Sequence, residues 1–197
     1  MSGARRALFS RNKLERIDVY QLHRIDPAVP EEEQFEFLQR VQREGKIRHV
    51  GLSEVSVAQI QRATKWFQVA SVQNRYNLVD REWESVLDYC DREGIGFIPW
   101  FPLQAGEVGR GGPGYYPRLV RRFVNRNHSL AQIGKRHGAT AAQIALAWLL
   151  RRSAVVLPIP GTSNRRHLEE NVAAAGIELS PEDPEDIDAL SKKPDLP

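Results

Sequence analysis

The alternation of short apolar runs with amphipathic segments constrains the fold of this 197-residue chain more than any other feature. The apolar runs predict five strands, at Ile17–Leu22, Ile47–Leu52, Val69–Gln73, Gly96–Leu103 and Val155–Ile159. Strands that are apolar throughout, each followed by a helical pattern, are typical of a parallel sheet covered by helices. The sequence therefore predicts an α/β fold.

The predicted helices begin and end at recognisable residues. Two begin with a capping-box pattern, Ser56 with Gln59 and Thr140 with Gln143, which satisfies backbone donors at a helix start. Other boundaries are set by glycine or proline, and the expected helices span 30–44, 82–93, 130–137, 140–152, 164–174 and a short stretch after Pro181. The glycine-rich segment 106–114 is expected to be a long loop.

Two parallel architectures fit this pattern, an open doubly wound sheet and a (β/α)8 barrel of the TIM-barrel type. No G-x-G-x-x-G follows a strand, so the usual dinucleotide fingerprint of the open sheet is missing. Polar or unusual residues lie at the C-terminal ends of all five predicted strands, at His23, Ser53, Gln73, Trp100 and Thr162. Barrel enzymes assemble their sites from that face, which favours the barrel.

Composition indicates one domain, 1–197, with 41% hydrophobic residues and a net charge of only +3. No apolar run is long enough to cross a membrane and the N-terminus does not resemble a signal peptide, so a cytoplasmic protein is expected. Cys90, the single cysteine, lies in a helical pattern and is expected to be buried and inert. No metal site is predicted.

One stretch is locally basic and contains Arg118, Arg121, Arg122, Arg126, Lys135 and Arg136. Three interpretations stay open for it: a nucleic-acid patch, a solvated face and a loop over an anionic cofactor. The overall charge balance gives no reason to expect nucleic acid as a partner.

Five motifs, taken in order, resemble those of the aldo-keto reductases. They are IDVYQLHRID (17–26), GLSEVS (51–56), VQNRYN (72–77), IPWFPL (98–103) and PIPGTSNRRHLEEN (158–171). The resemblance implies an incomplete barrel covering about strands 4 to 8. Residues 1–13 would then be the remnant of the preceding helix, and 177–197 a C-terminal tail.

Members of this family reduce carbonyls with a tyrosine proton donor, helped by a lysine, an aspartate and a histidine. His23 matches the histidine, and an imidazole there can donate a hydrogen bond to a carbonyl oxygen. The other three residues belong to family strands that precede the matched part, so this chain lacks them. Tyr20 is an odd number of residues from His23 and should face the other way, and nothing else in the sequence indicates Tyr76 as a donor.

The resemblance also implies an NADP(H) site. Trp100 matches the ring that stacks on the nicotinamide, Ser53 and Gln73 match the side chains that bond the carboxamide, and Pro102 and Leu103 match the stretch beside the pyrophosphate. Glu54 stands where the family more often has Asn.

The last motif matches the adenosine end of the cofactor. Gly161, Thr162 and Ser163 form a turn into a helix, whose free amides favour a phosphate, and Glu170 and Asn171 match the adenine partners. The family often has Lys at the position of Gly161 and Arg at that of His167. Arg165 or Arg166 are the candidate replacements, so a preference for NADPH over NADH stays open. Arg110 could close over the pyrophosphate from the long loop or be an exposed, uninvolved arginine.

Two functions follow from the resemblance. The first is an NADPH-dependent oxidoreductase that reduces small aldehydes or ketones to alcohols. The second is a non-catalytic NADP-binding or structural remnant without the catalytic Asp, Tyr and Lys. Open edges of the incomplete barrel, at Ile17–Leu22 and Val155–Ile159, are expected to favour self-association.

Overall fold

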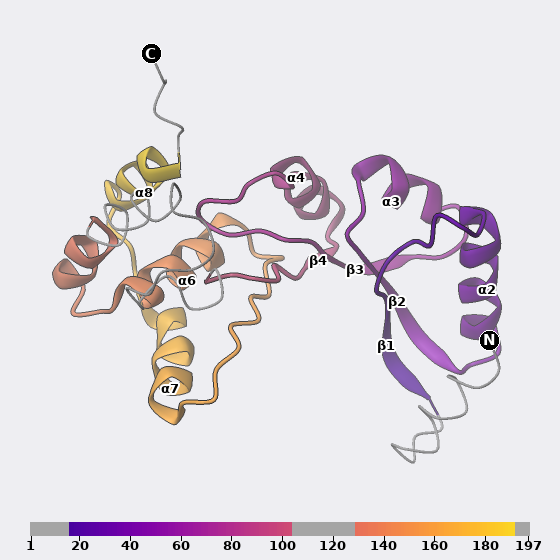
Figure 1. The fold of residues 1–197 in the computed structure, drawn as a ribbon, viewed down its shortest axis with the longest axis horizontal. Helices are drawn as coiled ribbons and strands as arrows, with labels where there is room; N and C mark the ends of the chain where they lie inside the picture. Colours follow the sequence, from indigo (N-terminus) through magenta and orange to yellow (C-terminus); the bar gives the residue numbers. More distant parts are fainter. Residues whose placement is uncertain (1–15, 104–128, 192–197) are drawn as a thin grey trace. The chain divides into compact units, whose positions relative to one another are not determined.

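The computed structural model of the chain describes residues 16–103 and 129–191 (Figure 1). Residues 1–13, the glycine-rich segment 106–114, Arg110 and the arginines of the basic stretch up to Arg126 lie outside these residues. The chain divides into two compact units. The first comprises residues 1–74 and 88–97, and the second comprises residues 75–87 and 98–197.

A parallel sheet of four strands, in chain order, forms the centre of the first unit. It contains β1 (Ile17–Leu22), β2 (Ile47–Ser53), β3 (Val69–Gln73) and β4 (Gly96–Phe97). The parallel α/β arrangement predicted from the alternation is therefore present. In this sheet β1 is an edge strand, and its Val19 is 52% exposed. Self-association through this edge stays a prediction.

The two faces of the sheet carry different side chains. One face is apolar and fully buried, with Val50 and Leu52 on β2, Val72 on β3 and Phe97 on β4. Helices α2 (Glu31–Arg43) and α3 (Val57–Ala63) of the same unit bury Phe35, Leu38, Val41 and Ile60. The opposite face carries small or polar residues, which are described below with the site.

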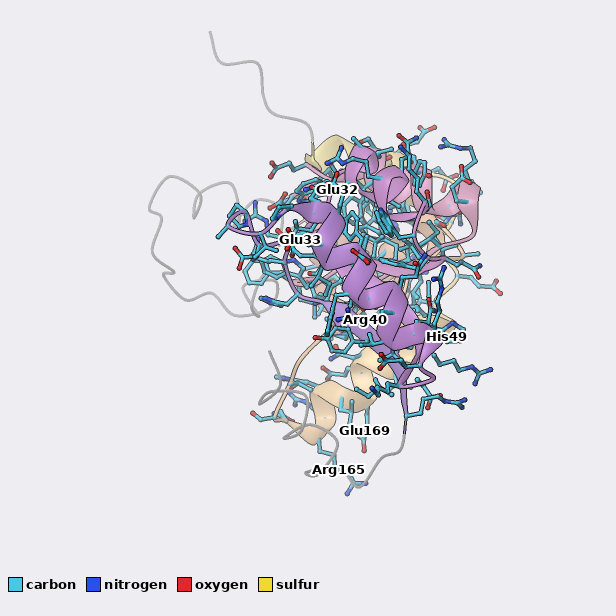
Figure 2. The ribbon with its side chains drawn as sticks, turned by 90° about the vertical axis from the view of Figure 1, so that its right-hand side faces the viewer. Glu32, Glu33, Arg40, His49, Arg165 and Glu169 are labelled. Carbon is cyan, nitrogen blue, oxygen red and sulfur yellow. The ribbon has the colours of Figure 1, made fainter. Side chains whose placement is uncertain are left out.

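Local signals in the sequence set the helix boundaries. Both capping boxes form, at Ser56 before α3 and at Thr140 before α6 (Ala141–Arg152). Gly45 ends the turn after α2 with a φ of 70°. Figure 2 shows Glu32 and Glu33 at one end of α2 and Arg40 further along it, the charge order that the helix dipole favours.

Helix α4 (Glu84–Glu93) carries Cys90, which is fully buried, as expected. Burial raises the pKa of the Cys90 thiol to about 12. A thiol so protonated at neutral pH is a poor nucleophile, so it packs as a small apolar group.

In the second unit, a helix at 129–136, α6, α7 (Arg165–Ala173), a 3₁₀ turn η2 (Ala174–Gly176) and α8 (Asp183–Ser191) follow one another. Residues 144–149 of α6 are all buried, which makes α6 the central helix of this unit. In the part of the chain that the structure describes, no helix is long and apolar enough to cross a membrane.

Two strand predictions were wrong. The strand expected at 96–103 ends at Phe97, and the one expected at 155–159 does not form beyond an isolated bridge residue at Val156. Proline lacks the amide donor that a strand needs, and Pro99, Pro102, Pro158 and Pro160 interrupt these two segments. Leu157 and Ile159 are half exposed, so the second predicted edge is not a strand edge.

A buried carboxylate fixes the start of α8. Asp183 accepts hydrogen bonds from Arg136, from the His137 ring at 2.6 Å and from the Ser180 backbone amide at 2.7 Å. Burial alone would raise the pKa of Asp183, but these hydrogen bonds outweigh it and hold the pKa well below its usual range. The ionised carboxylate therefore joins α8 to the helix at 129–136.

We expect Asp183→Asn to destabilise the chain by about 2 kcal/mol near neutral pH, because its three donors lose a charged acceptor. A lowered folded-state pKa gives stability that is present above the unfolded value and is lost as the pH falls below about 4. Urea unfolding at several pH values should show less acid destabilisation in the variant. Glu185→Gln, an exposed change on the same helix, is the control and should resemble the wild type.

Candidate functional site

Ser53 and Gln73 lie side by side at the carboxyl ends of β2 and β3. They are register partners, and the Ser53 hydroxyl donates to the Gln73 backbone carbonyl at 2.8 Å. Ser53 is 3% exposed, whereas the Gln73 side chain is half-buried. Because the Ser53 hydroxyl donates its hydrogen to Gln73, its oxygen can act as an acceptor toward a ligand. The side-chain amide of Gln73 lies beside it, and the two groups together can bind a primary amide of a ligand.

On the same face of the sheet, the next residue pair toward the start of the strands belongs to a polar layer that crosses three strands. The Gln21 side chain donates to the Leu52 carbonyl at 2.8 Å and accepts from the Ser71 hydroxyl at 3.1 Å. Gly51 lies between Gln21 and Ser71 in the register, and a Cβ built there would lie 2.6 Å from Gln21 Oε1. The absent side chain at Gly51 thus lets Gln21 reach across β2 beneath Ser53 and Gln73.

His23 follows β1 directly and is exposed. It is two residues beyond Gln21, on the strand edge from which the polar layer begins. Its neighbour Arg24 lies 3.7 Å from the Glu54 carboxylate. Glu54, which departs from the family's usual Asn, is therefore paired with a cation at the same end of the sheet.

Trp100 lies in the second unit, after the end of β4. It forms an isolated parallel bridge with Arg75, and its carbonyl accepts from the Tyr76 amide at 3.4 Å. Its ring is 5.8 Å from the ring of Phe101. Pro102 is buried and Leu103 is half-buried, so this short segment is anchored on both sides of the exposed Phe101.

The turn before α7 holds Gly161, Thr162 and Ser163, which are all exposed. Asn164 caps the helix by accepting from the Arg166 amide at 2.9 Å, and the Thr162 hydroxyl accepts from the Asn164 amide at 3.1 Å. The structure thus confirms that the turn opens a helix. An exposed, small-residue turn of this kind gives an anion access to the helix start.

Arg165 and Arg166, the candidate replacements for the missing cations, form ion pairs along α7. Arg165 pairs with Glu169 at 3.0 Å, and Arg166 pairs with Glu170 at 3.4 Å. Figure 2 labels Arg165 and Glu169 on this helix. Exposed pairs of this kind contribute little and exchange readily. His167, Glu170 and Asn171 are half-buried on the same helix.

Tyr76 has a structural role that the sequence did not reveal. It is fully buried, its ring stacks on that of Trp148, and its hydroxyl donates to Glu84 at 2.8 Å. Glu84 also accepts from Arg152. Burial and the adjacent carboxylate raise the pKa of Tyr76 well above its usual range, which makes it a poor proton donor. No spacing signal joins positions 76, 84 and 152.

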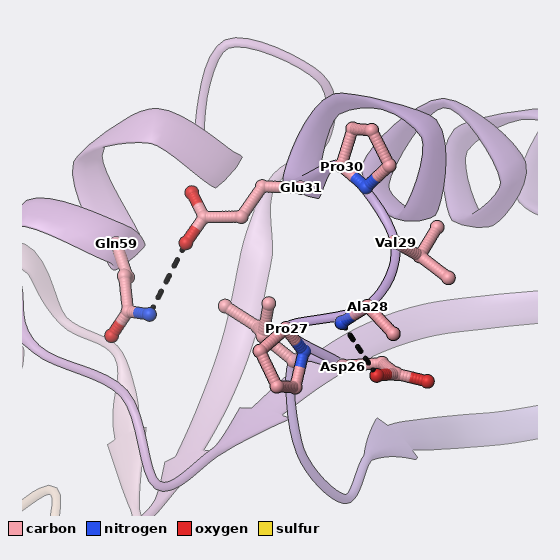
Figure 3. Close-up of a pocket in the computed structure, with 8 residues that line it drawn as sticks. Asp26, Pro27, Ala28, Val29, Pro30, Glu31 and Gln59 are labelled. Atoms are coloured by element: carbon pink, nitrogen blue, oxygen red, sulfur yellow. Dashed lines mark hydrogen bonds between the residues drawn. The ribbon is translucent and has the colours of Figure 1, made fainter.

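A hollow of about 520 Å³ opens beside the segment that follows β1 (Figure 3). It is lined by residues 25–31 and Gln59, and its wall is held by the Glu31–Gln59 hydrogen bond at 3.2 Å. None of the site residues predicted from the sequence lines it.

The sequence profile of the Aldo/keto reductase family matches residues 5–192. The chain belongs to the aldo/keto reductase family. It is 50% identical over 169 residues to an uncharacterised oxidoreductase, C215.11c, of Schizosaccharomyces pombe, covering 86% of this chain and 50% of that protein. It is 36% identical to the pyridoxine 4-dehydrogenase of Escherichia coli over 79% of this chain and 49% of that one.

Solved structures of aldo-keto reductases share the fold. The Klebsiella pneumoniae aldo/keto reductase, in complex with NADP and acetate, matches 98% of this chain and 65% of its own with a TM-score of 0.77 and 28% identity. The thermostable reductase Tm1743, in complex with epalrestat, matches 94% and 64% with a TM-score of 0.78 and 28% identity. The predicted α/β barrel class is thereby confirmed, and the chain spans about half the length of the curated relatives it matches.

We expect Gly51→Ala to destabilise this aldo-keto reductase chain by about 1–2 kcal/mol, because the new methyl group displaces Gln21 from its two hydrogen bonds. Thermal unfolding would measure the loss. Gly161→Ala is the matched control, since nothing lies within 4 Å of a Cβ at that position. Equal melting temperatures for the two variants would contradict the polar layer.

Proposed function

We propose that this chain carries the NADP(H)-binding part of an oxidoreductase. The observation that carries the proposal is the Ser53–Gln73 pair at the carboxyl edge of the parallel sheet, which presents an amide and an oxygen side by side. Ligands of open and closed parallel sheets bind at that edge. A solved relative of the same fold contains NADP, which supports the choice of ligand.

The remaining candidate residues have complementary roles in this proposal. Ser53 and Gln73 bind the carboxamide of the nicotinamide, and Trp100 stacks on its ring. Pro102 and Leu103 lie along the pyrophosphate. When bound, the reduced nicotinamide supplies the hydride, and the protein holds its ring and excludes water from it.

The adenosine end is assigned to α7 and the turn before it. Thr162 and Ser163 offer hydroxyl donors to a phosphate at the helix start, and Gly161 allows close approach. Glu170 and Asn171 bind the adenine. Arg165 and Arg166 can leave their exposed pairs with Glu169 and Glu170 to meet a 2'-phosphate, which supports NADPH as the cofactor.

The substrate class we propose is small aldehydes and ketones. His23 is exposed at the end of β1, where its ring can donate a hydrogen bond to a carbonyl oxygen. That contact orients the carbonyl and stabilises the negative charge that develops on its oxygen as hydride arrives.

The alternative is an NADP-binding protein without turnover. Two observations on the residues that the structure describes support it. Tyr76 is committed to Glu84, and Tyr20 pairs in register with Val50, on the opposite face of the sheet from Gln21 and Gly51. Among the described residues, neither of these tyrosines is therefore placed as a proton donor.

NADPH binding should quench tryptophan fluorescence in a saturable way. Trp100→Ala should reduce the amplitude and weaken binding about tenfold, since stacking of an aromatic ring contributes roughly 1–1.5 kcal/mol. Trp66→Ala, a change in a different unit, is the control and should leave the dissociation constant unchanged. A titration with no saturable quenching in the wild type would remove the proposed cofactor function.

NADPH oxidation separates the two candidate functions. With an activated aldehyde, the chain should show no steady oxidation of NADPH, because general acid catalysis typically contributes ~10²- to 10⁴-fold and, among the residues that the structure describes, neither Tyr20 nor Tyr76 is placed as its donor. The absorbance of NADPH measures this directly. Steady consumption that His23→Ala abolishes would overturn the non-catalytic alternative and establish the oxidoreductase in this chain.

A further inference from the structure

Two residues that are not glycine adopt left-handed backbone conformations among the residues that the structure describes. They are Glu54, with a φ of 55°, and Phe101, with a φ of 65°. This region is costly for side chains with a Cβ, and a bulky residue such as Phe stays there only when its surroundings impose it. Each follows directly after a candidate cofactor residue, Ser53 in one case and Trp100 in the other.

In the first unit, Asn74 fixes the backbone of Val55, the residue that follows Glu54. Its side-chain oxygen accepts from the Val55 amide at 3.1 Å, and its side-chain nitrogen donates to the Val55 carbonyl at 2.8 Å. The backbone amide of Glu54 itself donates to the Gln73 carbonyl at 3.0 Å. Asn74 is fully buried, so water does not compete for these bonds.

In the second unit, Asn77 does the same for Phe101. Its side-chain nitrogen donates to the Phe101 carbonyl at 3.1 Å. Its side-chain oxygen accepts from the amides of Val79 and Asp80 at 3.0 and 2.9 Å, which fixes the orientation of the side chain. Asn77 is 2% exposed.

Both asparagines belong to the motif VQNRYN, of which the proposed function uses only Gln73. We propose that Asn74 and Asn77 are positioning residues: within its own unit, each imposes the left-handed conformation of Glu54 or Phe101 and so orients the preceding residue, Ser53 or Trp100, for its proposed contact with the cofactor. This inference rests on the proposed cofactor function.

The amide side chain is suited to this role because it both donates and accepts. The Asn74 side chain accepts a hydrogen bond from the backbone of Val55 and donates one to it. At position 77 the acceptor is used within its own turn, and only the donor reaches Phe101. An aspartate keeps the acceptor and loses the donor. Asn77→Asp therefore preserves the turn and removes the bond to Phe101 alone.

The test is a double-mutant cycle on NADPH binding by the full chain. We expect Asn74→Ala and Asn77→Asp each to raise the Kd about tenfold, which corresponds to ~1.4 kcal/mol. Glycine adopts positive φ without a steric cost, so the loss should shrink to less than about twofold in the backgrounds Glu54→Gly and Phe101→Gly respectively. A merely structural role would give the same loss in both backgrounds, and that result would overturn the proposal.

Controls separate loss of positioning from loss of stability. Gln39→Ala removes a side-chain amide bond to a backbone carbonyl in the first unit, and Gln143→Ala breaks the capping box of α6 in the second. Both should lower the melting temperature and leave the Kd unchanged. Circular dichroism confirms that each variant is folded.

A readout independent of the cofactor distinguishes this inference from the proposed function. The backbone ¹³C chemical shifts of residues 54 and 101 report their left-handed conformations. If the wild type binds no NADPH but the asparagine variants shift these signals, the cofactor function fails and the backbone role stands. If the signals are unchanged in Asn74→Ala and Asn77→Asp, the positioning role is overturned, whatever the binding result.

Discussion

The parallel pairing of β2 with β3, which keeps one register from Gly51 to Ser53 after a shift between Val50 and Gly51, is the interaction on which the first unit depends. Because register partners point to the same side of a sheet, it sends Leu52 and Val72 into the buried apolar face and leaves Gly51, Ser71, Ser53 and Gln73 on the other. A shift by one residue would exchange the two faces and bury the site. Two hydrogen bonds reinforce that register on the face that carries the candidate site. They join Ser53 to the Gln73 carbonyl and Ser71 to Gln21.

The second unit is organised around α6 and depends on satisfied buried polar groups. Tyr76 stacks on Trp148 of α6 while its hydroxyl, Glu84 and Arg152 form a connected set of hydrogen bonds. Asp183 supplies the corresponding anchor for α8. Removing one member of such a set leaves a buried group unpaired, which costs more than the bond itself contributes. This is why Tyr76, a tyrosine close to a strand end, serves packing and not proton transfer.

Much of the fold could be predicted because its signals are local. Both capping boxes act within four residues of chain, and the first three strands are continuous apolar runs without proline. The last two predicted strands do not form over their expected lengths, because prolines, among them Pro99 and Pro158, interrupt their apolar runs. The order of motifs identified the family, and the profile match over residues 5–192 confirmed it.

The sequence by itself predicted which residues contact a cofactor, since Ser53, Gln73 and Trp100 each lie at or near the C-terminal end of a predicted strand. It also determined where α3 and α6 begin. Only the tertiary structure decided what holds those residues in place. The left-handed backbones at Glu54 and Phe101, and the buried asparagines that bond beside them, join positions about twenty residues apart or more. Local propensity disfavours such conformations in Glu and Phe, so they exist only because long-range hydrogen bonds in a buried environment outweigh the steric cost.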